Sequence, residues 1–178
     1  MHPILSTERL ILRKFTPQDA QDFYNLNNDP EVLKFTGDLP FSSVMEAESF
    51  LKNYDAYEKY GIGRWAVILK SKLEFIGFCG LKYHPDKDIV EIGYRLFKSF
   101  WGQGFATEAA KASIQYGFEK LGYKKIVAHV HQKNIASQRV LEKIGMTKQQ
   151  YILYDGQPAI LYTIDNNNFL KNDQKGVC

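Results

Sequence analysis

Cysteine is scarce in this sequence: Cys79 and Cys178 are the only two among 178 residues. One lies inside an apolar run and the other is the last residue, which excludes the disulfide framework of small secreted domains and suits a reducing compartment. No apolar run approaches the roughly 18 residues that a membrane-spanning helix needs. The first residues carry early charges and no long apolar core, unlike a signal peptide. We therefore expect a soluble, cytoplasmic protein that does not bind a membrane.

Charge of one sign is also lacking. Lys and Arg together number 23 and Asp and Glu 20, which gives a formal net charge of +3 without any basic cluster. A nucleic-acid-binding domain needs a concentrated basic patch, so this composition argues against that class. His129 and His131 fall on one side of a strand-like run, but no third ligand stands at a spacing that a zinc site would use. We expect neither nucleic acid nor a metal as a partner.

The length and the apolar content suit one globular domain. A chain of 178 residues, 44% of them hydrophobic, builds one sizeable core and leaves no room for a second full domain. Strand-like alternation and helical periodicity take turns along the sequence, which indicates a mixed α/β fold. We expect residues 1–170 to form the domain and residues 171–178 to form a polar C-terminal tail.

A glycine-rich segment lies at the centre of the chain. Gly102, Gly104 and Ala106 follow the alternating apolar run Ile89–Phe97 and precede a helical pattern. Small residues between a strand and a helix let the backbone approach a ligand closely. The first turn of the helix has free N–H groups at the positive end of its dipole, which suits phosphate. The pattern therefore predicts a phosphate-binding loop.

The same glycines admit other interpretations. Glycines after a strand often form only a turn. A dinucleotide-binding loop needs a third glycine where Thr107 stands, and the chain ahead of the loop is mostly hairpin rather than the opening of a βαβ unit. A nucleotide-binding P-loop needs Gly-Lys-Ser or Gly-Lys-Thr, which this sequence lacks. A nicotinamide-dependent enzyme is therefore disfavoured and a P-loop is excluded.

The segment WGQGFATEA resembles the acetyl-CoA pyrophosphate loop of the GNAT superfamily of N-acetyltransferases. The family pattern is Arg or Gln, two residues, Gly, one residue, then Gly or Ala. Gly104 and Ala106 match it, whereas Trp101 stands where the Arg or Gln would be. That substitution is similar to the branch of the ribosomal-protein N-terminal acetyltransferases RimJ and RimL. Three further segments resemble the family in the same order along the chain: TERLILR, EIGYRL and NIASQRVLEKIGM.

The resemblance implies a fold and a cosubstrate. The fold is a central, mostly antiparallel sheet of about seven strands flanked by about four helices. The cosubstrate is acetyl-CoA. The residues that the resemblance assigns to it are Leu96, Phe97 and Asn134 on pantetheine, and Gly102, Gln103, Gly104, Ala106 and Thr107 on the pyrophosphate.

Glu91 and Ser137 are the candidate catalytic residues. A lysine-type amine has a pKa near ~10 and must lose a proton before it attacks at neutral pH. Glu91 lies on the strand expected nearest the thioester and suits a general base, directly or through water, but it equally suits an ion pair with Arg95 on the same strand face. At the position of Leu141, many family members have a Tyr that acts as the general acid. The resemblance to the Rim-like branch implies that Ser137 lies near the sulfur. Asn134 and Ser137 also suit a plain helix cap and its first turn.

These residues together suggest an acetyl transfer from acetyl-CoA to a primary amine. The amine attacks the thioester directly, without a covalent enzyme intermediate, and the acceptor is a protein N-terminus or a small amine. A non-catalytic acyl-CoA-binding or sensing domain on the same fold is the alternative, because a fold does not fix a function. We expect a monomer or a homodimer.

Overall fold

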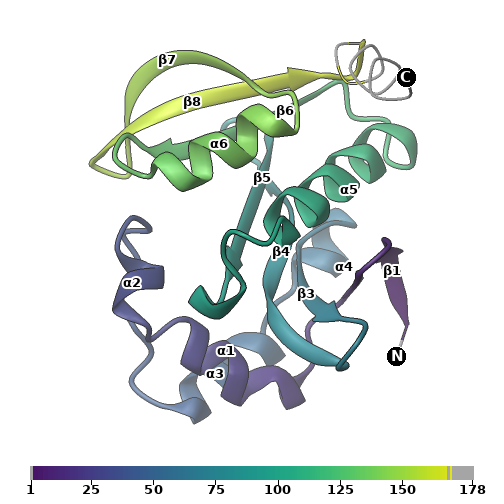
Figure 1. The fold of residues 1–178 in the computed structure, drawn as a ribbon, viewed down its shortest axis with the longest axis vertical. Helices are drawn as coiled ribbons and strands as arrows, with labels where there is room; N and C mark the ends of the chain where they lie inside the picture. The colour runs from purple at the N-terminus through teal and green to yellow at the C-terminus, as the bar shows by residue number, and fades with distance from the viewer. Residues whose placement is uncertain (1, 168, 170–178) are drawn as a thin grey trace.

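An eight-stranded sheet runs through the computed structural model, which describes residues 2–167 and 169 (Figure 1). The expected tail, residues 171–178, lies outside the described residues. Across the sheet the strand order is β1-β2-β3-β4-β5-β6-β8-β7, and all neighbours are antiparallel except β5 and β6. The strands are β1 (Pro3–Ser6), β2 (Leu10–Arg13), β3 (Arg64–Leu69), β4 (Glu74–His84), β5 (Ile89–Leu96), β6 (Lys125–His131), β7 (Thr147–Tyr154) and β8 (Gln157–Asp165).

Local sequence chemistry starts the helices. The Ser43 side chain accepts a hydrogen bond from the Glu46 N–H at 3.2 Å, and Asp29 accepts one from the Glu31 N–H at 2.9 Å, so both act as N-caps. Two short 3₁₀ turns, Pro17–Asp19 and Lys98–Phe100, precede α1 and the glycine loop. The α-helices of the described residues are α1 (Ala20–Leu26), α2 (Pro30–Leu33), α3 (Val44–Lys52), α4 (Ala56–Tyr60), α5 (Phe105–Glu119) and α6 (Ile135–Lys143).

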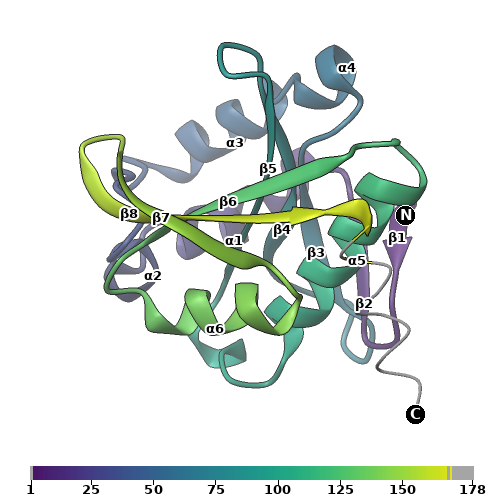
Figure 2. The ribbon, with the colours of Figure 1, turned by 90° about the horizontal axis from the view of Figure 1, so that it is seen from above.

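Helices cover both faces of the sheet (Figure 2). The longer helix α5 packs on one face against β4 and β5, and α1 and α3 pack together on the other. Strand β3 shows the consequence, because Trp65 and Val67 enter the core under α5 while Ala66 and Ile68 enter the core under α1 and α3. Successive side chains of a strand point to opposite faces, so a strand covered on both faces is apolar throughout.

Strands β5 and β6 separate after a single pair of hydrogen-bonded ladder residues. Their parallel ladder contains one residue pair, Glu91 with Val127, whereas β5 stays paired with β4 as far as Leu96. Beyond Glu91 the edge of β5 that faces β6 therefore has no strand partner. Cavities lie along this edge, and α6, which follows β6, forms their opposite wall. The parting of the two strands opens the sheet to a ligand.

The expected fold is confirmed, with additions. The sheet is mostly antiparallel and belongs to a mixed α/β fold, but it contains β1 besides the expected strands. Two short helices, α2 and α4, raise the number of α-helices in the described residues from about four to six. Pro30 starts α2 because its fixed φ suits a first helical position behind the Asp29 cap. Elements of four or five residues are too short for periodicity to reveal.

The start of α5 is fixed by the hairpin of β1 and β2. The Glu108 carboxylate in the first turn of α5 accepts hydrogen bonds from the Thr7 hydroxyl, the Arg9 N–H at 2.9 Å and the Arg9 Nε at 2.7 Å. Burial raises the pKa of Glu108, but the bonds from Thr7 and Arg9 outweigh it, and the pKa is lowered overall. This cluster joins two of the segments that carry the family resemblance and holds the glycine loop in place.

We predict that Glu108→Gln lowers the free energy of unfolding by about 2 kcal/mol at pH 7, because charge-assisted hydrogen bonds are lost. A carboxylate whose pKa is lowered in the folded state stabilises it above the unfolded pKa of about 4.3, and that stabilisation disappears as the pH falls. The difference between the variant and the original chain should therefore shrink below pH 4. Urea denaturation at several pH values measures it.

Glu119→Gln is the matched control, because Glu119 lies exposed at the other end of the same helix and, among the described residues, accepts a side-chain hydrogen bond from Gln115 alone. Its expected effect is within about 0.5 kcal/mol. Equal losses in the two variants would contradict a specific role of the Glu108 cluster.

Candidate active site

A cavity of about 600 Å³ extends from the glycine loop to the gap between β5 and β6. The end of β5, the loop, the first turn of α5, α6 and α2 contribute its walls. A smaller cavity of about 80 Å³ continues it into the gap, with Tyr94 and Ser137 lining both. The predicted cofactor residues in the wall of the large cavity are Leu96, Gly102, Gly104, Ala106, Thr107 and Asn134.

The loop residues Gly102 and Gly104 line the large cavity. Gly102 and Gly104 have φ values of 73° and 83°, a left-handed conformation that glycine adopts without strain. Gly104 is the N-cap of α5, and within the described residues no side chain caps this helix end. The first N–H groups of a helix have no acceptor inside it. Arg9 anchors the loop from behind by donating to the Gln103 carbonyl at 3.0 Å.

Two predicted cofactor residues use their polar groups elsewhere. The Gln103 side-chain amide donates to the Ser99 carbonyl at 2.8 Å. The Phe97 ring packs edge-to-face on Phe75, with 6.4 Å between ring centres, and its N–H donates to the Ile76 carbonyl. Neither residue lines the large cavity, so the loop and Leu96 form that wall without them.

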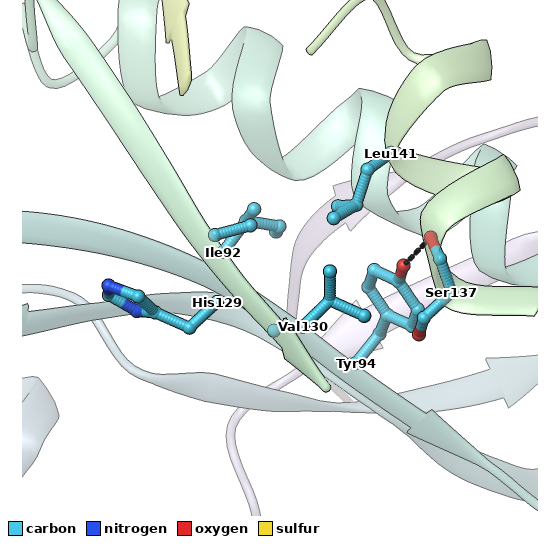
Figure 3. Close-up of a pocket in the computed structure, with 8 residues that line it drawn as sticks. Ile92, Tyr94, His129, Val130, Ser137 and Leu141 are labelled. Carbon is cyan, nitrogen blue, oxygen red and sulfur yellow. Dashed lines mark hydrogen bonds between the residues drawn. The ribbon is translucent and has the colours of Figure 1, made fainter. Parts of the chain in front are cut away.

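Helix α6 forms the second wall. The Asn134 side chain accepts a hydrogen bond from the Ser137 N–H at 3.1 Å, so the interpretation as a helix cap is confirmed. The Tyr94 hydroxyl donates to the Ser137 carbonyl at 3.1 Å and ties α6 to β5 across the gap (Figure 3). Burial raises the pKa of Tyr94, so its phenol stays protonated. Ser137 lines both cavities.

Positive charges along α6 were not found from the sequence. Lys133, Arg139 and Lys143 line the large cavity together with Ile135 and Val140. Arg139 and Lys143 are four residues apart and therefore lie one above the other on the helix. The four-residue spacing of these two basic residues, on the helix predicted to begin after Asn134, could have indicated a basic stripe from the sequence.

Glu91 is the centre of a buried polar cluster. Its Oε1 lies 2.8 Å from His129 Nδ1 and its Oε2 lies 2.7 Å from His84 Nε2, while an Arg64 nitrogen lies 3.8 Å from Oε2. Burial raises the pKa of Glu91, but the hydrogen bonds from His129 and His84 and the charge of Arg64 outweigh it, and the pKa falls far below its usual range. The Glu91 side chain is therefore an ionised carboxylate, held in place by its hydrogen bonds.

The alternative of an ion pair between Glu91 and Arg95 is wrong. Arg95 instead bonds to the Asn27 side chain and to Asp38, at 2.5 Å, and its guanidinium lies over the Phe78 ring. The two side chains share a strand face, but Arg95 points along α1 and the loop after α2. Sequence spacing alone could not show that loops distant in the chain supply its partners.

The two histidines of β6 do not act together. His129 bonds to Glu91, and His131 stacks on Phe35 with 5.1 Å between ring centres. Over the described part of the chain, no group of three or more His, Cys, Asp or Glu side chains is arranged to hold a metal ion. Nor does any helix in that part have the length and apolar character to cross a membrane.

The family model described as "Acetyltransferase (GNAT) domain" matches residues 9–147. The uncharacterized N-acetyltransferase YoaA of Bacillus subtilis is 37% identical over 89% of this chain and 93% of its own length. The uncharacterized N-acetyltransferase p20 of Bacillus licheniformis is 35% identical over 97% of this chain and 98% of its own.

Solved structures agree with the fold. A GNAT-family acetyltransferase from Bacillus anthracis superposes with a TM-score of 0.79 and 26% identity over 92% of this chain and 98% of that one. Two further structures, under 25% identical, show likeness of fold alone. They are a spermidine N-acetyltransferase from Vibrio cholerae in complex with CoA and spermine (TM-score 0.78, 22% identity, 92% and 99% covered) and a ribosomal-protein-S5-alanine acetyltransferase from Vibrio fischeri (0.77, 18%, 93% and 97%). With its matched domain and its relatives above 30% identity, this chain belongs to the acetyltransferase (GNAT) family.

Proposed function

We propose that this chain transfers the acetyl group of acetyl-CoA to a primary amine. The observation that carries the proposal is one continuous space, which runs from the uncapped start of α5 to the gap between β5 and β6. A phosphate-binding end and a narrow opening in the sheet suit a ligand with a diphosphate at one end and a thioester at the other. CoA has that shape.

The bound cofactor would follow this space. Backbone N–H groups from Gly102 to Thr107 hold the diphosphate, with Gln103 contributing through its backbone. The pantetheine passes Leu96 and Asn134, which line the large cavity, towards the gap. Unpaired backbone of β5 beyond Glu91 supports hydrogen bonds to pantetheine and to the thioester oxygen, because its ladder with β6 has ended there.

The chemistry needs few side chains. The amine nitrogen bonds to the acetyl carbon, the C–S bond breaks, and CoA leaves as a thiolate. Ser137, which lines both cavities, lies near the sulfur and orients the leaving group. Glu91 and the imidazole cluster around it lie on the amine side, where the amine must lose a proton.

The acceptor is a protein N-terminus or a small amine. Trp101 in the loop supports the RimJ/RimL branch, and the ribosomal-protein acetyltransferase fold neighbour is consistent with it. The spermidine acetyltransferase neighbour represents the small-amine class. A thiol-release assay with acetyl-CoA against short peptides, polyamines and other amines tests both. Tight CoA binding without turnover on any amine would instead indicate a non-catalytic acyl-CoA-binding domain.

We predict that Gly104→Val weakens CoA binding by about tenfold or more, because at a φ of 83° its Cβ would lie 3.3 Å from an Arg9 guanidinium nitrogen and displace the loop that holds the diphosphate. Isothermal titration calorimetry with CoA measures the change. Gly122→Val is the matched control: Gly122 has a similar φ of 70°, so the backbone strain is shared, but it lies beyond the far end of α5. Normal CoA affinity in Gly104→Val, or equal loss in both, would mean that the loop is not the phosphate site.

We also predict that Glu91→Gln lowers kcat by about tenfold or more with little change in CoA affinity, because the cluster loses the charge that organises its histidines. Steady-state kinetics on the best acceptor and calorimetry with CoA separate the two effects. Glu74→Gln, the same change at an exposed position on neighbouring β4, should leave both constants unaltered. Unchanged turnover in Glu91→Gln would remove Glu91 from the mechanism.

A further inference from the structure

Four neighbouring strands each deliver one polar side chain to the same buried point. Arg64 comes from β3, His84 from β4, Glu91 from β5 and His129 from β6, and the carboxylate binds both imidazoles at once. Placing a carboxylate and three such partners inside a sheet is costly unless their hydrogen bonds are satisfied. The cluster stands beside the separation of β5 and β6, where the reaction is proposed to occur.

The bond to Glu91 decides which nitrogen of His129 is free. An ionised carboxylate has no hydrogen to give, so His129 Nδ1 must be the donor in that bond. In the neutral imidazole the other nitrogen, Nε2, then carries a lone pair. No fully buried side-chain nitrogen or oxygen of the described residues lacks a hydrogen-bond partner, so Nε2, for which those residues supply none, keeps some exposed surface on a side chain that is 9% exposed. His129 thus offers an oriented proton acceptor that is not fully buried.

His129 also lines the small cavity in the gap, whereas His84 does not. Figure 3 shows its imidazole extending from β6 away from Tyr94 and Ser137, so the gap has an imidazole on one side and the Ser137 end of α6 on the other. The attacking amine and the departing sulfur lie on opposite sides of the thioester carbon. His129 is placed to serve the amine, and Ser137 is placed to serve the sulfur.

The groups around His129 hold its ring. The Tyr154 ring stacks on it, with 3.9 Å between ring centres and 13° between planes, and the Lys87 ammonium lies 4.9 Å from the centre of the Tyr154 ring. Burial raises the pKa of Tyr154 to about 12, so Tyr154 stays neutral at physiological pH. Arg64 and His84 occupy the other side of Glu91. Of this set, His129 alone lines the small cavity, and its Nε2 has no hydrogen-bond partner among the described residues.

We propose that His129 Nε2 takes the proton from the acceptor amine, and that Glu91 is a positioning residue that fixes the Nδ1–H tautomer. This inference rests on the proposed acetyl transfer. The ammonium gives one proton to Nε2, and the freed lone pair forms the bond to the acetyl carbon. When the C–S bond breaks, its electron pair leaves on the thiolate, which takes the second amine proton. The imidazolium returns its proton to solvent.

Glu91 itself is a poor acceptor for that proton. Both of its oxygens already accept hydrogen bonds from imidazoles, and its lowered pKa makes the carboxylate a weak base. Imidazole is the side chain that ordinarily changes charge between pH 5 and 8 and therefore suits proton transfer at neutral pH. A carboxylate that orients an imidazole for base catalysis is a recurring arrangement in enzymes.

The test is the pH dependence of kcat/KM for the original chain, His129→Gln and His84→Gln, with acetyl-CoA and the best acceptor amine. Protonated His129 cannot accept a proton, so the original chain should lose activity on the acid side. His129→Gln should lower kcat by about 100-fold or more, abolish that acid limb and leave CoA affinity intact. His84→Gln, which removes the other imidazole bound to the same carboxylate, should keep the limb.

Chemical rescue separates proton transfer from structure. Added imidazole should restore part of the activity of His129→Ala and none of His84→Ala, because only the first leaves a vacant site beside the amine. A His129→Gln profile that keeps its acid limb, with kcat within about threefold of the original, would overturn the role of His129 while acetyl transfer stands. An original chain that binds CoA but acetylates no amine would overturn the proposed function and this proton transfer with it.

Discussion

Beyond the single ladder pair of Glu91 and Val127, β5 loses its neighbour on one edge, and the rest of the site depends on that loss. Unpaired backbone groups must find hydrogen bonds, and a ligand that enters between the strands can supply them. Pairing β5 with β6 along its full length would close the smaller cavity and leave no route through the sheet. The separation therefore creates both the cofactor channel and the meeting point of the two reactants.

The surrounding structure keeps the gap open and oriented. On one side, the bonds from Thr7 and Arg9 to Glu108 fix the start of α5, which sets the direction of the loop N–H groups. On the other, the bond from Tyr94 to the Ser137 carbonyl holds α6 at its distance from β5. The Glu91 cluster ties four strands together just where their ladder ends. The contacts of Glu108, Tyr94 and Glu91 therefore stabilise the fold and also position the proposed site.

Local sequence patterns were enough to predict much of this fold. Alternation and capping residues predicted the α/β class, and the left-handed φ of Gly102 and Gly104 agrees with the loop read from their spacing. Contacts between distant segments could not be read in the same way. The partners of Glu91 come from three other strands and those of Arg95 from α1 and a loop, so one strand's periodicity placed Glu91 correctly but named the wrong neighbour. The role of Glu91 and Ser137 in catalysis remains a proposal.

The most direct measurement is a crystal structure of this chain with CoA bound. The account predicts diphosphate oxygens within hydrogen-bond distance of the backbone N–H groups between Gly102 and Thr107. It also predicts the sulfur in the gap between β5 and β6, with Ser137 on one side and His129 on the other. A diphosphate bound elsewhere, or a pantetheine that lies outside the sheet, would contradict it.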